Sequence, residues 1–492
     1  MREILKAVVK TSSGTIASLF FGALSIKVLA VVLGPVGVGM FSIVRQIQQL
    51  LVSVGTMGGQ IALVQGLSSK RKVSRDDYIV TSFWITFACT VLISICLVCF
   101  SHDIARLIFG EATTQMIVLV RWLILCLWVS VAYTFFNALL NGYRAIGIMA
   151  WGQISIAATS LAVVYKTAQM VKDGQPEVFV WMLSISFLTG FLVVFAKAYL
   201  AGWLKPALKR IIVGINVEEA KHFFSIGGTT VVTGLLTTGT LLFVRALIAN
   251  RMGMYSAGTF DVAWTLSMMY VTLILTSLGT YYLPTLAGMQ EKEQRQKFVG
   301  QLLYLTTLLF VPLVTIVILF KPLIIHVFYT SEFDYSLKIL RWMLIGDYFK
   351  VAAYVVAMPV LARADMKVFF VTELLWNGCF LLISFVSIYV LEDLQGIGVV
   401  FSILYGLLFA YYGFYAKSRY DIEFNYRMKC HWLLGLLVVV VVSWLTWSDI
   451  EMDWVKSVTV MSVVMFFSWF AIEVEDRRKL LDILSNRLPS QD

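Results

Sequence analysis

Fourteen apolar stretches divide this 492-residue chain, and each is long enough to cross a lipid bilayer as a helix. A spanning helix needs about 20 predominantly apolar residues, because its backbone polar groups must be satisfied inside the hydrocarbon. Of all residues 59% are apolar and 14% charged, too few charged side chains to cover soluble domains. The chain is therefore predicted to be an all-α polytopic membrane protein with 14 transmembrane helices. The predicted spans are residues 8–33, 36–66, 78–100, 117–140, 147–169, 177–202, 223–250, 257–287, 298–327, 339–361, 368–390, 395–416, 431–448 and 454–473.

Lysine and arginine residues gather on one side of these spans. With the N-terminus inside, 25 of the 39 basic residues fall in inside segments and 4 in outside loops. Because cytoplasmic loops carry the excess of Lys and Arg, both termini are predicted to be cytoplasmic. The formal net charge of +10 then reflects topology, and no nucleic-acid partner is expected.

The cysteines and histidines do not form a site. The 6 cysteines lie in or at the edges of apolar stretches, and the 4 histidines are scattered near span ends. Cys96 and Cys99 form a C-x-x-C, but it lies within an apolar stretch with no histidine or second cysteine pair nearby, so core packing is favoured over metal or redox use, and no disulfide framework is indicated. No metal, cofactor or catalytic residue is expected.

The chain contains a short internal sequence repeat. Gly39 and Phe41 align with Gly258 and Phe260 at an offset of 219 residues, each before a long helix. This predicts two six-helix bundles as a parallel pseudo-twofold repeat around a central cavity, with two extra C-terminal helices. The predicted parts are residues 1–205 for the N-terminal bundle, 206–222 for a cytoplasmic inter-bundle linker, 223–420 for the C-terminal bundle, 421–473 for helices 13 and 14, and 474–492 for a cytoplasmic amphipathic tail.

Charged residues inside the spans are the candidates for function, since each costs about 2.5–3.5 kcal/mol at mid-membrane. Ser42, Arg45 and Gln49 share one face of the second span by their spacing. The charges predicted in the outer half of the membrane are Lys27, Arg45, Arg245, Asp261, Asp347 and Lys350. Together they predict one net-positive chamber, which suits a substrate that carries phosphate.

Simpler explanations remain open for some of these residues. Asp347 and Lys350 lie one turn apart, so they are also explained if they merely neutralise each other. Lys27 lies off the polar stripe of its own helix. Lys321 and Arg341 lie near span ends and are expected to extend to the membrane interface.

Four motifs resemble one family of transporters. They are Leu33-Gly34-Pro35, Val44-Arg45-Gln46, Leu283-Pro284-Thr285-Leu286, and the run Gly346-Asp347-Tyr348-Phe349-Lys350-Val351-Ala352-Ala353-Tyr354. In order and spacing they resemble the Wzx flippases of O-antigen and enterobacterial common antigen assembly, within the multidrug/oligosaccharidyl-lipid/polysaccharide exporter superfamily. The resemblance covers about residues 1–420. The two extra helices depart from the usual Wzx plan and also occur in the related lipid II flippases.

The resemblance implies a multi-pass protein of the bacterial inner membrane that takes part in surface polysaccharide biosynthesis. It implies movement of an undecaprenyl-diphosphate-linked oligosaccharide from the cytoplasmic to the periplasmic leaflet through a cationic cavity. Lys27 and Arg45 match basic positions of the family. The expected partners are membrane lipids, the lipid-linked oligosaccharide, a polysaccharide polymerase and a chain-length regulator.

These observations predict an alternating-access flippase that is not an enzyme. The residues expected to bind the diphosphate-sugar head are Arg45, Arg245, Lys27, Lys350, Gln49 and Ser42. Asp261 and Asp347 are expected to balance these cations or to carry a coupling proton or Na⁺.

Two alternatives remain open. A drug/cation antiporter of the same superfamily would have an acidic or aromatic cavity. A membrane polymerase or glycosyltransferase would need a sizeable outside loop, whereas the longest one here offers only His102, Asp103 and Glu111.

Overall fold

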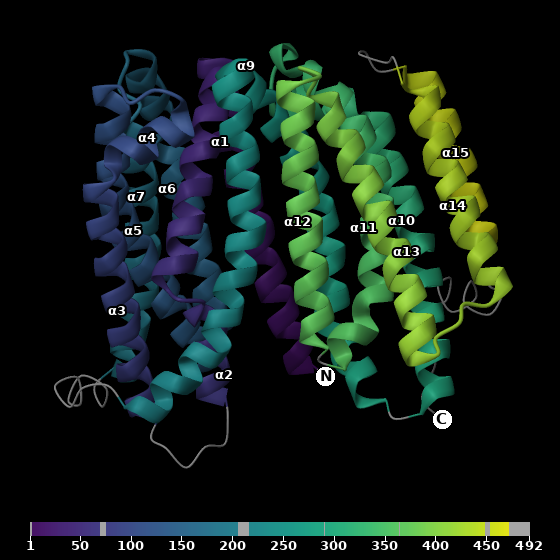
Figure 1. Ribbon diagram of the computed structural model, residues 1–492, viewed down its shortest axis with the longest axis horizontal. Helices are drawn as coiled ribbons and strands as arrows, with labels where there is room; N and C mark the ends of the chain where they lie inside the picture. Colours follow the sequence, from purple (N-terminus) through teal and green to yellow (C-terminus); the bar gives the residue numbers. More distant parts are fainter. Residues whose placement is uncertain are drawn as a thin grey trace. The chain divides into compact units, whose positions relative to one another are not determined.

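The computed structural model describes residues 2–68, 75–204, 216–289, 291–363, 365–447 and 453–471, and this part of the chain is helical without strands. Figure 1 shows the helices as long rods. The helices are α1 (Arg2–Gly55), α2 (Gly59–Ser68), α3 (Arg75–Cys99), α4 (Ser101–Phe109), α5 (Thr114–Gly142), α6 (Ile146–Lys172), α7 (Val178–Leu200), α9 (Val217–Gly288), α10 (Lys292–Phe328), α11 (Tyr335–Ala362), α12 (Met366–Tyr389), α13 (Gln395–Tyr420), α14 (Tyr426–Leu445) and α15 (Trp454–Ala471).

Two of these helices are too long to cross a membrane once. Helix α1 has 54 residues and α9 has 72, which correspond to roughly 80 and 110 Å against a hydrocarbon core of about 30 Å. Each is interrupted by one glycine with a non-helical backbone, Gly34 (φ 61°) and Gly253 (φ 86°). Positive φ is a conformation that glycine adopts without steric cost.

The predicted number of spans is confirmed once these breaks are counted. Among the described residues, 11 helices are long and apolar enough to span, and α15 contains a shorter apolar stretch, Trp454–Met465. Dividing α1 and α9 at their glycines gives 13 segments, and counting α15 as well gives the 14 predicted spans.

The two glycine breaks also belong to the internal sequence repeat. Gly34 and Gly253 are separated by the same 219 residues as Gly39 and Gly258. Gly39 and Gly258 lie where the two glycine-containing segments pack against each other. A Cβ on Gly258 would lie 1.9 Å from the carbonyl oxygen of Pro35. Such close backbone contact requires glycine. The repeat thus has a backbone counterpart, while the pseudo-twofold arrangement of whole bundles stays a prediction.

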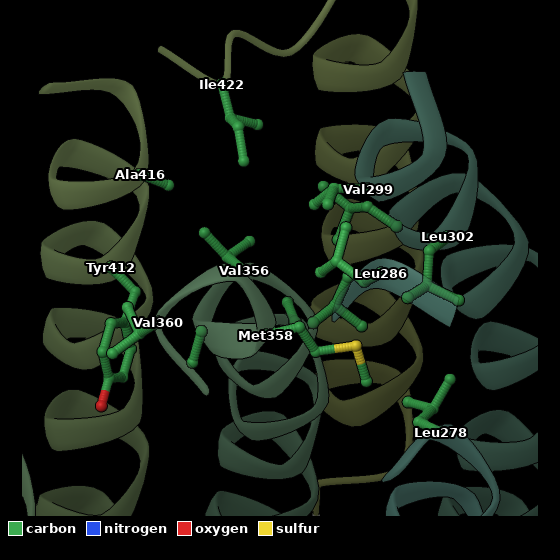
Figure 2. Close-up of a cluster of buried hydrophobic side chains, with 14 residues drawn as sticks. Leu278, Leu286, Val299, Leu302, Val356, Met358, Val360, Tyr412, Ala416 and Ile422 are labelled. Carbon is green, nitrogen blue, oxygen red and sulfur yellow. The ribbon is translucent and has the colours of Figure 1, made fainter. Parts of the chain in front are cut away.

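The chain forms two compact units. Unit 1 comprises residues 1–261, 328–332 and 388–390, and unit 2 comprises 262–327, 333–387 and 391–492. In unit 1, α1 packs against α6, and α7 packs against both α5 and α6. In unit 2, α11 packs against α13, and Figure 2 shows an apolar cluster that includes Leu286, Val356 and Ile422.

The predicted domain boundaries differ from the boundary between the two units, and they stay a prediction. The unit boundary falls inside α9, after Asp261, whereas the predicted linker is residues 206–222. Most of that linker, and the predicted tail 474–492, lie outside the described residues.

Helix α14 is fixed to unit 2 by two cations. The side chain of Lys321 is only 2% exposed, and its ammonium donates to the carbonyl oxygen of Thr446 at 3.0 Å. Arg341 donates to the carbonyl oxygen of Trp447 at 2.8 Å and lies 4.2 Å from the centre of that residue's ring. Both cations thereby donate hydrogen bonds to carbonyls at the helix C-terminus that lack an intrahelical partner. The expectation that Lys321 extends to the membrane interface is therefore wrong, because its ammonium is buried against α14.

Candidate functional site

A charged group in unit 1 centres on Arg245, whose side chain is largely buried on α9 (5% exposed). Its guanidinium donates to the amide oxygen of Gln46 and to the carboxylate of Asp261. The amide nitrogen of Gln46 in turn donates to the carbonyl oxygen of Thr238 at 3.2 Å. A buried arginine is tolerated only when it is paired and hydrogen-bonded. This arrangement supplies a carboxylate and an amide, so Asp261 acts here as the counter-ion of Arg245.

Arg45 lies next to Gln46 in the sequence but on another side of the helix, about 100° away. Its side chain is exposed, and it forms no ion pair with any residue that the structure describes. Gln49, one turn further along α1, is also exposed. Arg45 and Gln49 therefore present a polar face that is open to a ligand.

The other two predicted ligands of unit 1 have protein partners. Ser42 is buried, and its hydroxyl donates to the carbonyl oxygen of Gly39 at 2.8 Å within the same helix. The ammonium of Lys27 donates to the carbonyl oxygen of Tyr329, in the segment 328–332 that belongs to unit 1. Both side chains hold protein structure in this conformation.

A second charged group lies in unit 2 around Asp347 of α11, whose side chain is fully buried (0% exposed). Its carboxylate accepts hydrogen bonds from the hydroxyl of Ser267 at 2.9 Å and from that of Tyr270 at 2.7 Å. Both donors come from the second half of α9. No cation of the described residues lies within ion-pair distance of this carboxylate.

Lys350 lies one turn after Asp347 on α11, yet it faces different neighbours. Its ammonium lies 2.9 Å from the sulfur of Met268. It also lies 5.7 Å from the ring centre of Phe401 and 5.2 Å from that of Tyr405, within the range of cation–π attraction. Asp347 and Lys350 thus do not form a direct ion pair, although each still feels the charge of the other.

The structure places the predicted site residues in two groups. Lys27, Ser42, Arg45, Gln49, Arg245 and Asp261 belong to unit 1, and Asp347 and Lys350 belong to unit 2. That both groups line one chamber stays a prediction. Among the described residues, no set of three His, Cys, Asp or Glu side chains is arranged to hold a metal ion.

Sequence reasoning missed the uncharged partners of both groups. Gln46 is adjacent to Arg45 but lies off the polar stripe that contains it, so the helical spacing does not mark it as a site residue. Ser267 and Tyr270 are three residues apart on α9, the spacing of one helix face. That spacing was the available signal, but no charge drew attention to it.

Two bacterial proteins have similar sequences. The lipid III flippase of Escherichia coli (strain K12) is 23% identical over 385 residues, covering 75% of this chain and 88% of the relative. The putative O-antigen transporter of Shigella flexneri is 22% identical over 360 residues, covering 70% of this chain and 81% of the relative.

Solved structures show the same fold. The lipid II flippase MurJ in its inward closed conformation matches with a TM-score of 0.67 at 15% identity, covering 94% of this chain and 98% of that one. An inward-facing multidrug resistance MATE family transporter of the MOP superfamily matches with a TM-score of 0.64 at 13% identity, covering 89% and 98%. At these identities the likeness concerns the fold alone.

The sequence itself assigns the family. The model of the family described as polysaccharide biosynthesis protein matches residues 28–338, which is more than half of the chain and includes both the Arg245 pair and the exposed Arg45. This multi-pass membrane protein therefore belongs to the polysaccharide biosynthesis protein family.

Proposed function

We propose that the chain is a flippase that moves an undecaprenyl-diphosphate-linked oligosaccharide from the cytoplasmic to the periplasmic leaflet. The names of the lipid III flippase and the putative O-antigen transporter support a lipid-linked saccharide as substrate. The fold shared with MurJ and with MATE transporters supports transport by alternating access. The lipid tail stays in the bilayer, and the polar head crosses through the protein without covalent chemistry.

The observation that carries this proposal is the state of Arg45. Its neighbour Arg245 already has a carboxylate and an amide as partners, whereas Arg45 is exposed and has no ion-pair partner among the described residues. A guanidinium inside a membrane span is costly unless an anion or water meets it. A diphosphate offers several oxygens to such a planar fork of donors, with Gln49 one turn away as a further hydrogen-bonding group.

The same observation disfavours a drug/cation antiporter. The open charge in unit 1 is positive, and the carboxylate of Asp261 is paired with Arg245. This carboxylate is therefore not available to a cationic drug.

Coupling of transport is assigned to unit 2. Asp347 has two hydroxyl donors and no paired cation among the described residues, so a proton or Na⁺ that neutralises it would change the charge of that group. Movement of about two negative charges outward is also favoured by an inside-negative potential, by about 2.3 kcal/mol per charge per 100 mV. Asp261 serves as charge balance for Arg245.

The proposal places the protein in the bacterial inner membrane with both termini in the cytoplasm. There it would work beside a polysaccharide polymerase and a chain-length regulator. In this scheme Lys27 and Lys350 reach the substrate in the conformation in which their present contacts open.

Replacement of Arg45 in the native host tests the function. We expect Arg45→Ala to stop display of full-length surface polysaccharide and to cause the lipid-linked oligosaccharide to accumulate, with Arg45→Lys retaining part of the activity. Lys166→Ala, which removes another exposed cation of a membrane span, is the matched control and should leave display unchanged. Normal display by Arg45→Ala at wild-type protein abundance would contradict the proposal.

A further inference from the structure

The segment 328–332, which joins α10 to α11, belongs to unit 1, although α11 and nearly all of α10 belong to unit 2. In the predicted topology this outer segment lies in an outside loop, at the same end of the spans as the glycine breaks at Gly34 and Gly253. Its place in unit 1 therefore depends on contacts that the order of the sequence does not provide.

The main chain of Tyr329, near the start of the outer segment, is bound by a cation of α1. The ammonium of Lys27 donates a hydrogen bond to the carbonyl oxygen of Tyr329. Lys27 is also one of the residues expected to bind the diphosphate-sugar head. Hydrogen bonds from a charged donor are roughly twice as strong as those between neutral groups. The outer segment thus occupies a cation that the proposed substrate would also use.

The side chain of Tyr329 is buried in unit 1, with only 3% of its surface exposed. Burial raises the pKa of its hydroxyl, the charge of Asp261 raises this pKa further, and the charge of Arg45 lowers it. Charges act in this way when they are near the titrating group. Tyr329 therefore approaches the candidate site twice, at Lys27 through its carbonyl and at Arg45 and Asp261 through its ring.

Glu332, at the other end of the outer segment, contacts both helix breaks. Its carbonyl oxygen accepts a hydrogen bond at 2.7 Å from the hydroxyl of Tyr255, two residues after the break at Gly253. Its carboxylate lies against Gly34, where a Cβ would be 2.5 Å from Oε2. A helix segment resumes at Pro35, and an acidic group near the N-terminal end of a helix is stabilised by the helix dipole.

The contacts of Tyr329 and those of Glu332 differ in what can break them. A diphosphate carries full negative charge, so it competes with the neutral carbonyl of Tyr329 for the ammonium of Lys27. Tyr255 is an uncharged donor and Gly34 has no side chain, so an anion has no cation to take from Glu332. Binding of an anion would therefore release the Tyr329 end of the outer segment first.

We propose that Tyr329 is a plug residue of the head-group site, which means that it occupies the site until the substrate displaces it. In this conformation its carbonyl holds Lys27, and its ring lies near Arg45. A diphosphate that binds both cations displaces Tyr329, and the outer segment opens to let the head leave. The inference rests on the proposed function for the identity of the substrate, whereas competition between an anion and Tyr329 is a property of unit 1.

Hydrogen–deuterium exchange of the purified full chain tests the plug, with inorganic pyrophosphate as the probe. The readout is the exchange rate of the backbone amides of residues 328–332, which follows local opening of the segment. Rising pyrophosphate should accelerate this exchange in the wild type. Because Lys27→Met removes a charged hydrogen bond, it should exchange at least about tenfold faster without the probe and show no further response to it.

Two further variants serve as controls. Lys166→Met removes an exposed cation of α6, and it should keep both the wild-type rate and the wild-type response. Tyr255→Phe removes only a hydroxyl from an exposed side chain, so it should fold normally. It loosens the Glu332 end, and it should therefore exchange faster than the wild type while retaining the response to pyrophosphate.

Unchanged exchange of residues 328–332 in wild-type protein with pyrophosphate would overturn the proposal. An equal pyrophosphate response in Lys27→Met would do the same, because the anion would then act without this cation. The readout requires no transport. A protein with the expected exchange rates that translocates no lipid-linked oligosaccharide would support the plug and contradict the proposed function, so the two can fail separately.

Discussion

In unit 1 the carboxylate of Asp261 meets the guanidinium of Arg245, whereas in unit 2 the carboxylate of Asp347 meets only the hydroxyls of Ser267 and Tyr270. The cations differ in the same way. Arg245 is bound into its group, while Lys350 lies against the sulfur of Met268 and two aromatic rings.

The difference separates two tasks. In unit 1 the carboxylate is balanced internally, so the second cation, Arg45, is left open for an anion from outside the protein. In unit 2 the carboxylate lacks a direct cation partner among the described residues, so its charge is open to a proton or a small cation. In the function proposed above, unit 1 would recognise the head group and unit 2 would couple transport.

The largest effect is expected from breaking the ion pair of unit 1. Arg245→Met leaves Asp261 and Gln46 without the group that they serve, and removal of one partner of a buried pair typically costs about 3–5 kcal/mol of unfolding free energy. The double variant with Asp261→Asn should recover much of this loss, because no lone charge remains. Denaturant unfolding of the purified protein in detergent measures both, and a double variant as unstable as Arg245→Met would contradict the assignment of Asp261 as counter-ion.

A smaller effect on stability, with a clear effect on coupling, is expected in unit 2. The amide oxygen of Asp347→Asn still accepts from Ser267 and Tyr270, so the unfolding free energy should change by only about 1 kcal/mol. The response of transport to an imposed proton or Na⁺ gradient should disappear. Asp103→Asn, at an exposed acid of α4, is the control, and a gradient response that persists in Asp347→Asn would remove coupling from this residue.

Lys350→Met should have a still smaller effect on stability. The lost cation–π attraction is about 0.5–2 kcal/mol, and part of it is offset because a methionine packs well against Met268, Phe401 and Tyr405. Unfolding of Lys350→Met should therefore resemble the wild type within about 1 kcal/mol. A loss as large as that of Arg245→Met would mean that Lys350 has a buried anionic partner, which would erase the difference between the units.

The smallest effect is expected at Ser42. Its hydroxyl donates to Gly39 in its own helix, a contact that contributes little to helix stability. Ser42→Ala should change unfolding free energy by no more than about 0.5 kcal/mol and leave transport intact. A transport defect at normal abundance would instead return Ser42 to the substrate-binding face with Arg45 and Gln49.

The fourteen spans could be predicted from the sequence because charged side chains and unpaired backbone groups are costly in lipid. Spanning segments are therefore apolar helices, and the loops carry the charges. The sequence also showed the repeat at Gly39 and Gly258. The glycines that precede them in the two copies, Gly34 and Gly253, form the helix breaks. Charged site residues were found for the same reason, since each in-span charge is expensive.

The partners of those charges were harder to predict. Gln46, Ser267 and Tyr270 are inexpensive in a span, so composition gives no signal for them, and their roles depend on which helices pack together. Lys321 shows the same limit. From sequence it is a lysine near a span end, but packing against α14 buries it on the carbonyl of Thr446.

In the proposed function, the open guanidinium of Arg45 recognises the diphosphate head. Purified wild-type protein and Arg45→Ala in proteoliposomes, assayed for translocation of an undecaprenyl-diphosphate-linked oligosaccharide, test it most directly. We expect translocation by the wild type, at least about tenfold slower translocation by Arg45→Ala, and partial recovery by Arg45→Lys. Equal rates for wild type and Arg45→Ala under the same membrane potential would contradict it.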